Sequence, residues 1–273
     1  MRSKRNALLI LPFIGLAVTA PFADPAARKG DALAARAGVR VLSAVGMRQV
    51  ISDLGPKFER ATGQRLKVSF DSGAVILKRL EGGEHADVVM LPRSGIDRLA
   101  GEGKLVAGSV TDLATSRVGV AVRRGAPRPD ISTPEAFRRA MLAAEKIACP
   151  DPALGGSSGL HIAEVFERLG IAVAVRPRLV LVSTPAREAT MPGRLVADGK
   201  AEVALHQMQE LLAVPGVEVV GPLPGDLQGT FLFSAAVTAG ARDVKAAKAL
   251  VSFLRTPEAR GVIKAKGMEP AGP

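Results

Sequence analysis

The chain has 273 residues and 47% hydrophobic residues, enough apolar material for one large domain or two lobes, and this excludes a disordered chain. It contains no Trp and no Tyr, so a site for sugars or quaternary amines, which relies on aromatic platforms, is not expected. The net charge is +11, but the basic residues are scattered and hardly any aromatics lie among them, so we predict an anionic ligand and no nucleic-acid partner.

Residues 1–23 are predicted to be a signal sequence. Three basic residues precede the apolar stretch ALLILPFIGLAVTA, which is the charged-then-apolar order of a secretory signal. The stretch is short and is soon followed by Asp24 and Pro25, so cleavage is favoured over a retained membrane anchor. We therefore expect a periplasmic protein and exclude this segment from the fold.

After Val39, short apolar runs alternate with helical patterns, which is typical of parallel sheets with crossover helices. Pro56 is expected to kink or divide the first helix. The expected strands span residues 39–43, 66–70, 87–91, 118–122, 146–149, 179–182, 202–206 and 230–237.

Two changes in composition indicate where the chain passes between lobes, at residues 108–117 and in the turn-rich stretch 221–229. With both as crossings, one lobe consists of residues 37–116 and 226–273, and the other consists of residues 117–225. Ligands of such sheets lie beyond the carboxyl ends of the strands.

Three strand-like runs end in small, hydrogen-bonding residues that open a helix: VRVLSAVGMRQV, LKVSFDSGAVILKRL and KIACPDPALGGSSGLHIAEVF. The first N–H groups of a helix have no partner within the helix and lie at the positive end of its dipole, so they suit an anion. Three such joints in one exported chain predict a ligand cleft.

Five segments resemble, in order, the periplasmic molybdate-binding components of ABC importers: VLSAVGMRQV, FERATGQRLKVSFDSGAVILKRLEGGEHADVVML, ACPDPALGGSSGLHIAEVFERLG, RLVADGKAEVALH and ALVSFLRTPEARGVIKAKGM. The resemblance covers nearly everything after Val39. It implies an α/β, two-lobed type II periplasmic binding fold with mixed, mostly parallel sheets, flanking helices and a two-strand hinge. It also implies a monomer that captures a small anion without a cofactor and delivers it to an ABC transporter permease.

The resemblance further implies a ligand site made of hydroxyls and backbone N–H groups. The candidate residues are Ser43, Gly46, Met47, Ser72, Gly73, Ala74, Ser157, Ser158, Ala189, Thr190, His206 and Gln207. Gly46 and Gly73 match two ligating serines of the family, and Gln207 matches its ligand-facing tyrosine. We therefore expect either an oxyanion such as molybdate or tungstate, or a small organic acid. For an organic acid, the two glycines would leave room for carbon, and Arg48, Arg187 or His206 could face a carboxylate.

A secreted serine hydrolase is the alternative, because residues 155–159 satisfy G-x-S-x-G, with Ser157 as nucleophile and Asp198 and His206 downstream. The loop after Cys149 is too long for a nucleophile elbow, and this cysteine is expected to be buried and inert. No metal site is expected, because the three histidines lie far apart without carboxylates at metal-ligand spacing. A regulator's effector domain can share the fold, but the leader argues against it. We expect a binding protein that catalyses no reaction.

Overall fold

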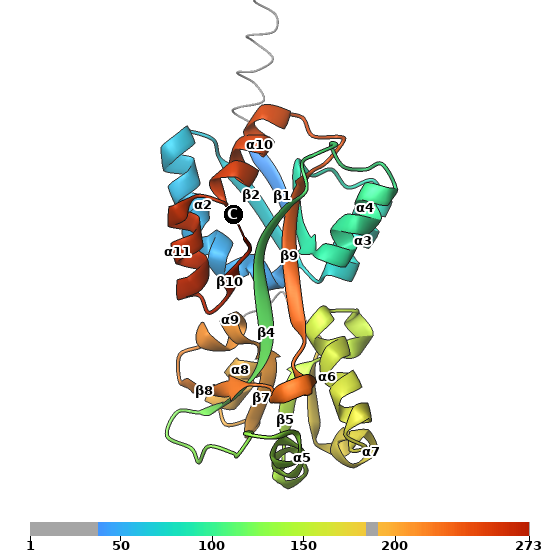
Figure 1. Cartoon of the computed structure of the whole chain (residues 1–273), viewed down its shortest axis with the longest axis vertical. Coiled ribbons are helices and arrows are strands. Elements are labelled where there is room, and N and C mark those ends of the chain that lie inside the picture. The colour runs from blue at the N-terminus through green and yellow to red at the C-terminus, as the bar shows by residue number, and fades with distance from the viewer. Residues whose placement is uncertain (1–37, 184–190, 273) are drawn as a thin grey trace, which may run out of the picture.

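The computed structural model describes residues 38–183 and 191–272. These residues form two α/β lobes, one above the other in Figure 1, and the chain crosses between them in β4 (Thr111–Arg123) and β9 (Thr230–Val237). No helix in the described part of the chain is long and apolar enough to span a membrane. The predicted signal sequence at residues 1–23 lies outside the described residues.

The first lobe, at the top of Figure 1, has helices on both sides of a mixed sheet. Its elements besides the crossing strands are β1 (Val39–Ala44), α2 (Arg48–Thr62), β2 (Leu66–Asp71), α3 (Gly73–Glu81), β3 (Val88–Pro92), α4 (Arg93–Gly101), α10 (Val244–Phe253), α11 (Pro257–Ala265) and β10 (Glu269–Pro270). The sheet order is β2-β1-β3-β9, in which β1 is parallel to β2 and β3, and β9 is antiparallel to β3.

The second lobe continues the sheet in the order β4-β7-β5-β6. Its elements are α5 (Pro134–Ala143), β5 (Ile147–Pro150), α6 (Ser157–Arg168), α7 (Ala172–Val175), β6 (Leu179–Val182), α8 (Pro192–Ala197), β7 (Val203–Gln207), α9 (Met208–Leu212) and β8 (Val217–Pro222). β5 is parallel to β6 and β7, whereas β7 and β8 are antiparallel to β4. Each lobe thus has a parallel centre that meets the antiparallel crossing strands.

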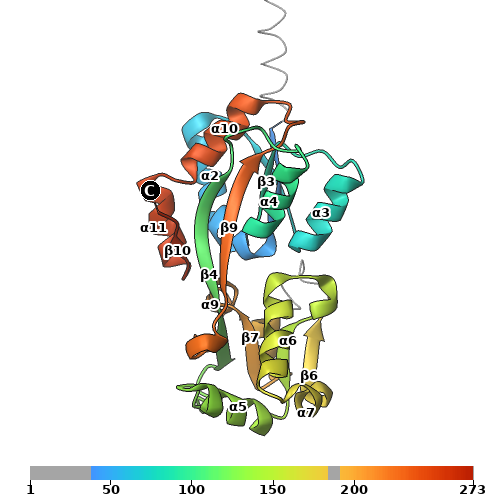
Figure 2. The same cartoon turned by 45° about the vertical axis from the view of Figure 1, so that its right-hand side comes forward.

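Strand β4 belongs to both lobes. Its residues 111–117 pair with β9, and residues 118–123 pair with β7 and β8. Both crossing strands run from one lobe to the other in Figures 1 and 2. Gln228 secures the junction, because its side chain accepts the N–H of Val118 at 3.1 Å and donates to the carbonyl of the same residue at 2.9 Å. The two-strand connection implied by the resemblance is therefore present.

Buried apolar side chains form separate clusters on the two sides of this crossing. The cluster of the first lobe includes Phe58 and Leu91 and takes in Ala114 from β4. A cluster of the second lobe begins at Val118 and still includes Leu227. The lobe limits at residues 116/117 and 225/226 stay predictions from composition.

Helix α2 continues through Pro56, so of the two expected effects of this proline, a kink or a division, the division is wrong. Val50, Leu54 and Phe58 lie on one buried face, and this face continues on both sides of the proline. The helix ends only at Gly63, whose φ of 72° is in the left-handed region that favours glycine. Burial of the apolar face therefore outweighs the one hydrogen bond that proline removes.

All eight predicted strands are present, but three further strand segments were not predicted. The first is residues 111–117 of β4, where the polar sequence TDLATSR indicates a crossing between the lobes and gives no strand signal. The others are β8 and β10, which are an outer partner and a two-residue partner of β4. Their sequences lack the continuous apolar run by which buried strands are recognised.

Candidate ligand site between the lobes

A cavity of about 60 Å³ lies between the lobes at the carboxyl ends of their parallel strands. A cavity needs about 10–15 Å³ measured in this way to hold one water molecule, so this cavity can hold several waters or a small group of a ligand. The first lobe contributes Ala44, Val45, Gly46, Ser72, Gly73, Pro92 and Phe233, and the second contributes Pro150, Asp151, Leu154, Gly156, Ser157, Ser158, Val182, His206 and Gln207.

Helix α6 directs its amino-terminal end at this cavity. Its N-cap is Gly156, which has no side chain to accept a hydrogen bond from the first turn. Ser157 and Ser158 follow and line the cavity. The first backbone N–H groups of the helix are thus left without a side-chain cap next to the space where an anion would lie.

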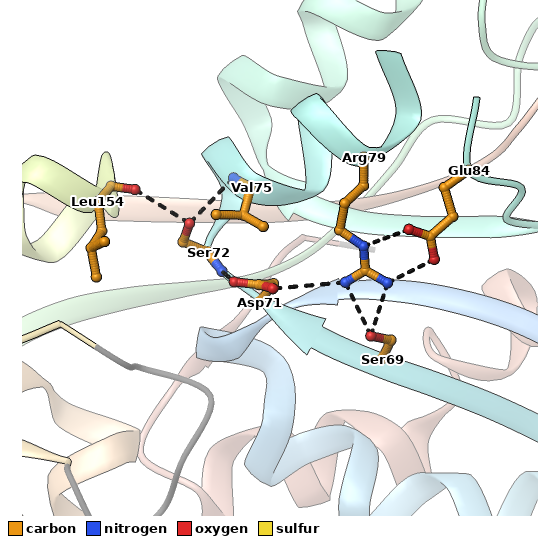
Figure 3. A network of polar contacts seen from close by, with 7 residues as sticks. All are labelled: Ser69, Asp71, Ser72, Val75, Arg79, Glu84 and Leu154. Carbon is orange, nitrogen blue, oxygen red and sulfur yellow. Dashed lines mark hydrogen bonds and ion pairs between the residues drawn. The ribbon is translucent and has the colours of Figure 1, made fainter. Parts of the chain in front are cut away.

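Ser72 uses its hydroxyl group to join the lobes. The oxygen accepts the N–H of Val75 at 3.3 Å and caps helix α3, while the hydroxyl donates to the carbonyl of Leu154 in the second lobe, also at 3.3 Å. Figure 3 shows both contacts. Since a serine has one hydroxyl proton, Ser72 in this conformation links the lobes and has no hydroxyl donor left for a ligand.

An ion-pair network stabilises the turn between β2 and α3 next to Ser72, as Figure 3 shows. Asp71 accepts the N–H of Ser72 at 2.9 Å and lies 3.8 Å from the guanidinium of Arg79. Arg79 also donates to Ser69 at 3.1 Å and to Glu84 at 2.7 Å. The hydrogen bond from Arg79 lowers the pKa of the Glu84 carboxyl group. The network fixes the turn between β2 and α3.

Gly46 is a glycine because other side chains occupy the space next to it. A β-carbon there would lie 2.4 Å from Gln207 Oε1 and 2.5 Å from Phe233 Cζ. At Gly73 the nearest atom would be Pro92 Cδ at 3.3 Å. The expectation that both glycines leave room for ligand carbon is therefore wrong at Gly46, where protein atoms fill the space.

His206 and Gln207 end strand β7 and are both buried at the cavity. Burial lowers the pKa of His206 to about 4. The Nδ1 atom of His206 accepts the backbone N–H of Gln207 at 2.6 Å, so the proton of the neutral ring is on Nε2. The imidazole is therefore an uncharged hydrogen-bond donor.

Gln209 and Glu210 were missed by the sequence analysis. Both are nearly inaccessible, at 1% and 2% exposure, although polar residues at the start of a short helix usually face solvent. Burial raises the pKa of Glu210 to about 7, although the charge of Arg48 opposes this shift. Within residues 38–183 and 191–272, the Oε1 atom of Glu210 has no hydrogen-bond partner.

The remaining predicted site residues lie away from the cavity or outside the described part. Ser43 is fully buried and donates to the carbonyl of Ala44, and Met47 belongs to the core of the first lobe. Ala74 instead contacts the second lobe, 3.0 Å from where a β-carbon of Gly155 would lie. The other three predicted positions, Arg187, Ala189 and Thr190, are outside the described residues.

The hydrolase alternative lacks the geometry of a catalytic triad. His206 Nδ1, which would have to donate to a carboxylate, accepts a backbone N–H, and Asp198 pairs with Arg194 at 3.2 Å. A turn of 3-10 helix separates Ser157 from strand β5, so no sharp elbow forms. Burial raises the pKa of Cys149 to about 12, which makes this thiol unreactive. No cluster suited to a metal ion occurs among the described residues.

Two α/β lobes that are joined by two strands and enclose a small, donor-lined cavity define a solute-binding protein of the type II periplasmic binding fold. The chain belongs to the family of bacterial extracellular solute-binding proteins, whose model matches residues 39–269. The resemblance stated from sequence and the predicted fold class are confirmed.

Known relatives carry two kinds of name. An aconitate isomerase of Pseudomonas sp is 33% identical over 236 residues, which are 84% of this chain and 87% of that protein. The molybdate-binding protein ModA of Azotobacter vinelandii is 28% identical over 245 residues, covering 85% and 89%. The solved periplasmic molybdate-binding protein of Azotobacter vinelandii shares the fold, with a TM-score of 0.70 at 18% identity, covering 86% of this chain and 99% of that one.

Proposed function

We propose that the chain captures a small organic acid anion in the cavity between its lobes, in the periplasm, and delivers it to the permease of an ABC importer. The observation that carries this proposal is the convergence of uncapped α6 N–H groups with His206 and Gln207. Hydrogen bonds to a charged group contribute about 1.5–3 kcal/mol each. A few of them offset the cost of association, so binding needs no full salt bridge.

The lack of a hydroxyl group at position 46 counts against molybdate as the ligand. Family members of the molybdate type are expected to place a serine hydroxyl there, but here Gln207 and Phe233 occupy that volume. The site therefore has fewer hydroxyl donors for a tetrahedral oxyanion. The 33% identical relative is named for an organic acid, and this name supports an organic acid as the ligand.

A thermal-shift panel tests the proposed ligand class. A ligand at about one hundred times its dissociation constant adds about 2.7 kcal/mol, which raises the melting temperature by roughly 5–10 °C for a protein of this size. We expect the largest shift from trans-aconitate, citrate or another small carboxylate, and smaller shifts from molybdate, tungstate, sulfate and phosphate. A shift with molybdate alone would contradict the organic acid, and no shift with any anion would contradict anion binding.

The substitution Ser158→Pro tests the contribution of the α6 backbone. Proline fits the first turn of a helix but has no N–H group, so it deletes one donor at the cavity. We expect ligand affinity to fall about tenfold, as for one charge-assisted hydrogen bond. Isothermal titration measures the affinity, and circular dichroism checks that the variant is folded. Unchanged affinity in a folded variant would remove this N–H group from the site.

Isomerase activity is the second candidate function, and the name of the 33% identical relative favours it. Our proposal remains binding without turnover. His206, whose pKa is about 4, is a weak base near neutral pH, and Glu210, whose pKa is about 7, does not line the cavity. Proton NMR of cis-aconitate incubated with the protein would decide, since formation of the trans isomer above the spontaneous rate establishes an enzyme.

A further inference from the structure

A buried chain of hydrogen bonds leads from the crossing strand β4 to the cavity. The hydroxyl of Ser116 donates to Gln209 Oε1 at 2.5 Å. The Nε2 atom of Gln209 donates to the carbonyl of Gly46 at 2.9 Å and to Gln207 Oε1 at 2.7 Å. The side chains of Ser116, Gln209 and Gln207 belong to residues that are at most 5% exposed. These hydrogen bonds join both lobes, because Gly46 lies in the first lobe and Gln207 lies in the second.

The carbonyl of Gly46 determines which atom donates and which accepts in each of these hydrogen bonds. A backbone carbonyl only accepts, so the amide nitrogen of Gln209 must face it. The second N–H of that nitrogen then requires an acceptor at Gln207, which must be Oε1. Consequently the NH₂ group of Gln207 is left for another partner, and it forms no hydrogen bond to any residue that the structure describes.

The glycine at position 46 is part of the same arrangement. A β-carbon there would lie 2.4 Å from Gln207 Oε1, so any larger residue would displace the atom that receives the hydrogen bond of Gln209. His206, the neighbour of Gln207 at the cavity, accepts the backbone N–H of Gln207 at Nδ1 and keeps its proton on Nε2. The side chains of His206 and Gln207 thus offer hydrogen-bond donors, and no acceptor, to a ligand in the cavity.

We propose that Gln209 is a positioning residue that holds the NH₂ group of Gln207 toward the ligand, so that the site selects an ionised carboxylate over a group that itself donates hydrogen bonds. This inference rests on the proposed function and adds a residue and a selectivity rule to it. Without Gln209, the amide of Gln207 can rotate by half a turn and present its oxygen, which accepts a donor. Loss of Gln209 therefore reduces discrimination, not affinity alone.

Side-chain amide NMR tests the chain of hydrogen bonds without any ligand. In nitrogen-15-labelled protein, both NH₂ protons of Gln209 should exchange with water at least about tenfold more slowly than those of the half-buried Gln49, because both are hydrogen-bonded and buried. Loss of one resonance pair in Gln209→Met and another in Gln207→Met provides the assignments. Fast exchange at Gln209 would overturn the inference, whatever the ligand.

Selectivity is tested with trans-aconitate and its three monoamides, in which one carboxylate becomes a carboxamide that donates. The native protein should bind at least one monoamide more than about tenfold less tightly than trans-aconitate, and Gln209→Met should reduce this ratio by about tenfold. Gln228→Met is the matched control, because Gln228 also bonds to a buried backbone but does not line the cavity. Its ratio should stay unchanged.

An equal loss of affinity for trans-aconitate and its monoamides in Gln209→Met would show a purely structural role and contradict the inference. Failure of trans-aconitate to bind the native protein would instead count against the proposed function. The exchange measurement would then decide on the hydrogen-bond chain by itself.

Discussion

Glu210→Gln is expected to stabilise the protein by about 3 kcal/mol at pH 8 and to have little effect at pH 4. Burial raises the pKa of Glu210 from 4.5 to about 7, so the folded protein keeps this proton where the unfolded chain has lost it. The folded state binds more protons in this interval, and stability therefore falls as the pH rises from 4.5 to 7. A neutral glutamine removes that loss.

His206 has the opposite effect over nearly the same interval. Its pKa falls from 6.5 to about 4, so the unfolded chain binds the extra proton and stability rises by about 3 kcal/mol as the pH increases from 4 to 6.5. In the native protein the two effects largely cancel between pH 4.5 and 6.5. In Glu210→Gln the effect of the histidine becomes visible as rising stability up to pH 6.5.

Urea unfolding from pH 4 to 8 measures both curves. Glu218→Gln is the matched control, because Glu218 is a partly exposed carboxylate paired with Arg128 at 3.1 Å, and such surface pairs contribute little. The control should change the free energy of unfolding by less than about 1 kcal/mol. Equal curves for Glu210→Gln and the native protein would contradict the burial of a shifted carboxyl group.

Gly46→Ala is expected to lower the free energy of unfolding by about 2–3 kcal/mol, whereas Gly73→Ala should lower it by less than about 1 kcal/mol. The sequence treats the two glycines alike, but the structure does not. An added methyl group at position 46 meets Phe233, which is fully buried, at 2.5 Å, while at position 73 it meets Pro92 at 3.3 Å. Neither glycine has a positive φ, so backbone strain does not enter the comparison.

Urea unfolding of the two variants measures this difference. The double variant Gly46→Ala with Phe233→Leu separates the two neighbours of position 46, since a smaller side chain should recover part of the loss if the aromatic ring causes it. Equal losses at positions 46 and 73 would show that the space next to Gly46 is not filled as described.

The strands and the convergence of their carboxyl ends could be predicted from the sequence because both depend on local signals. An apolar run followed by small residues marks a strand that opens a helix, and SSG at Ser157 marks the amino-terminal end of α6, whereas its lack of a side-chain cap is seen only in the structure. The first half of β4 gave no such signal. Its residues at the crossing, such as Ser116 and Arg117, are polar because they lie between the two cores.

The hydrogen-bond chain at the cavity could not be predicted because its members interact over long distances in sequence. Gly46 and Gln209 are 163 residues apart, and Ser116 and Gln209 are 93 apart. Taken singly, each has a common local explanation: a turn glycine, a strand serine and a glutamine in the first turn of a helix. Only the fold shows that they share one buried contact.

The shared strand β4 has a consequence for the order in which the molecule assembles. The second lobe lies almost wholly in one continuous stretch of chain, whereas the first lobe is completed by β9, whose Val237 pairs with Val88. During synthesis, one edge of β3 therefore stays unpaired until most of the polypeptide has been made. Pairing between residues so distant in sequence is expected to slow folding and to leave a strand edge open to other chains, so we expect the first lobe to limit the folding rate.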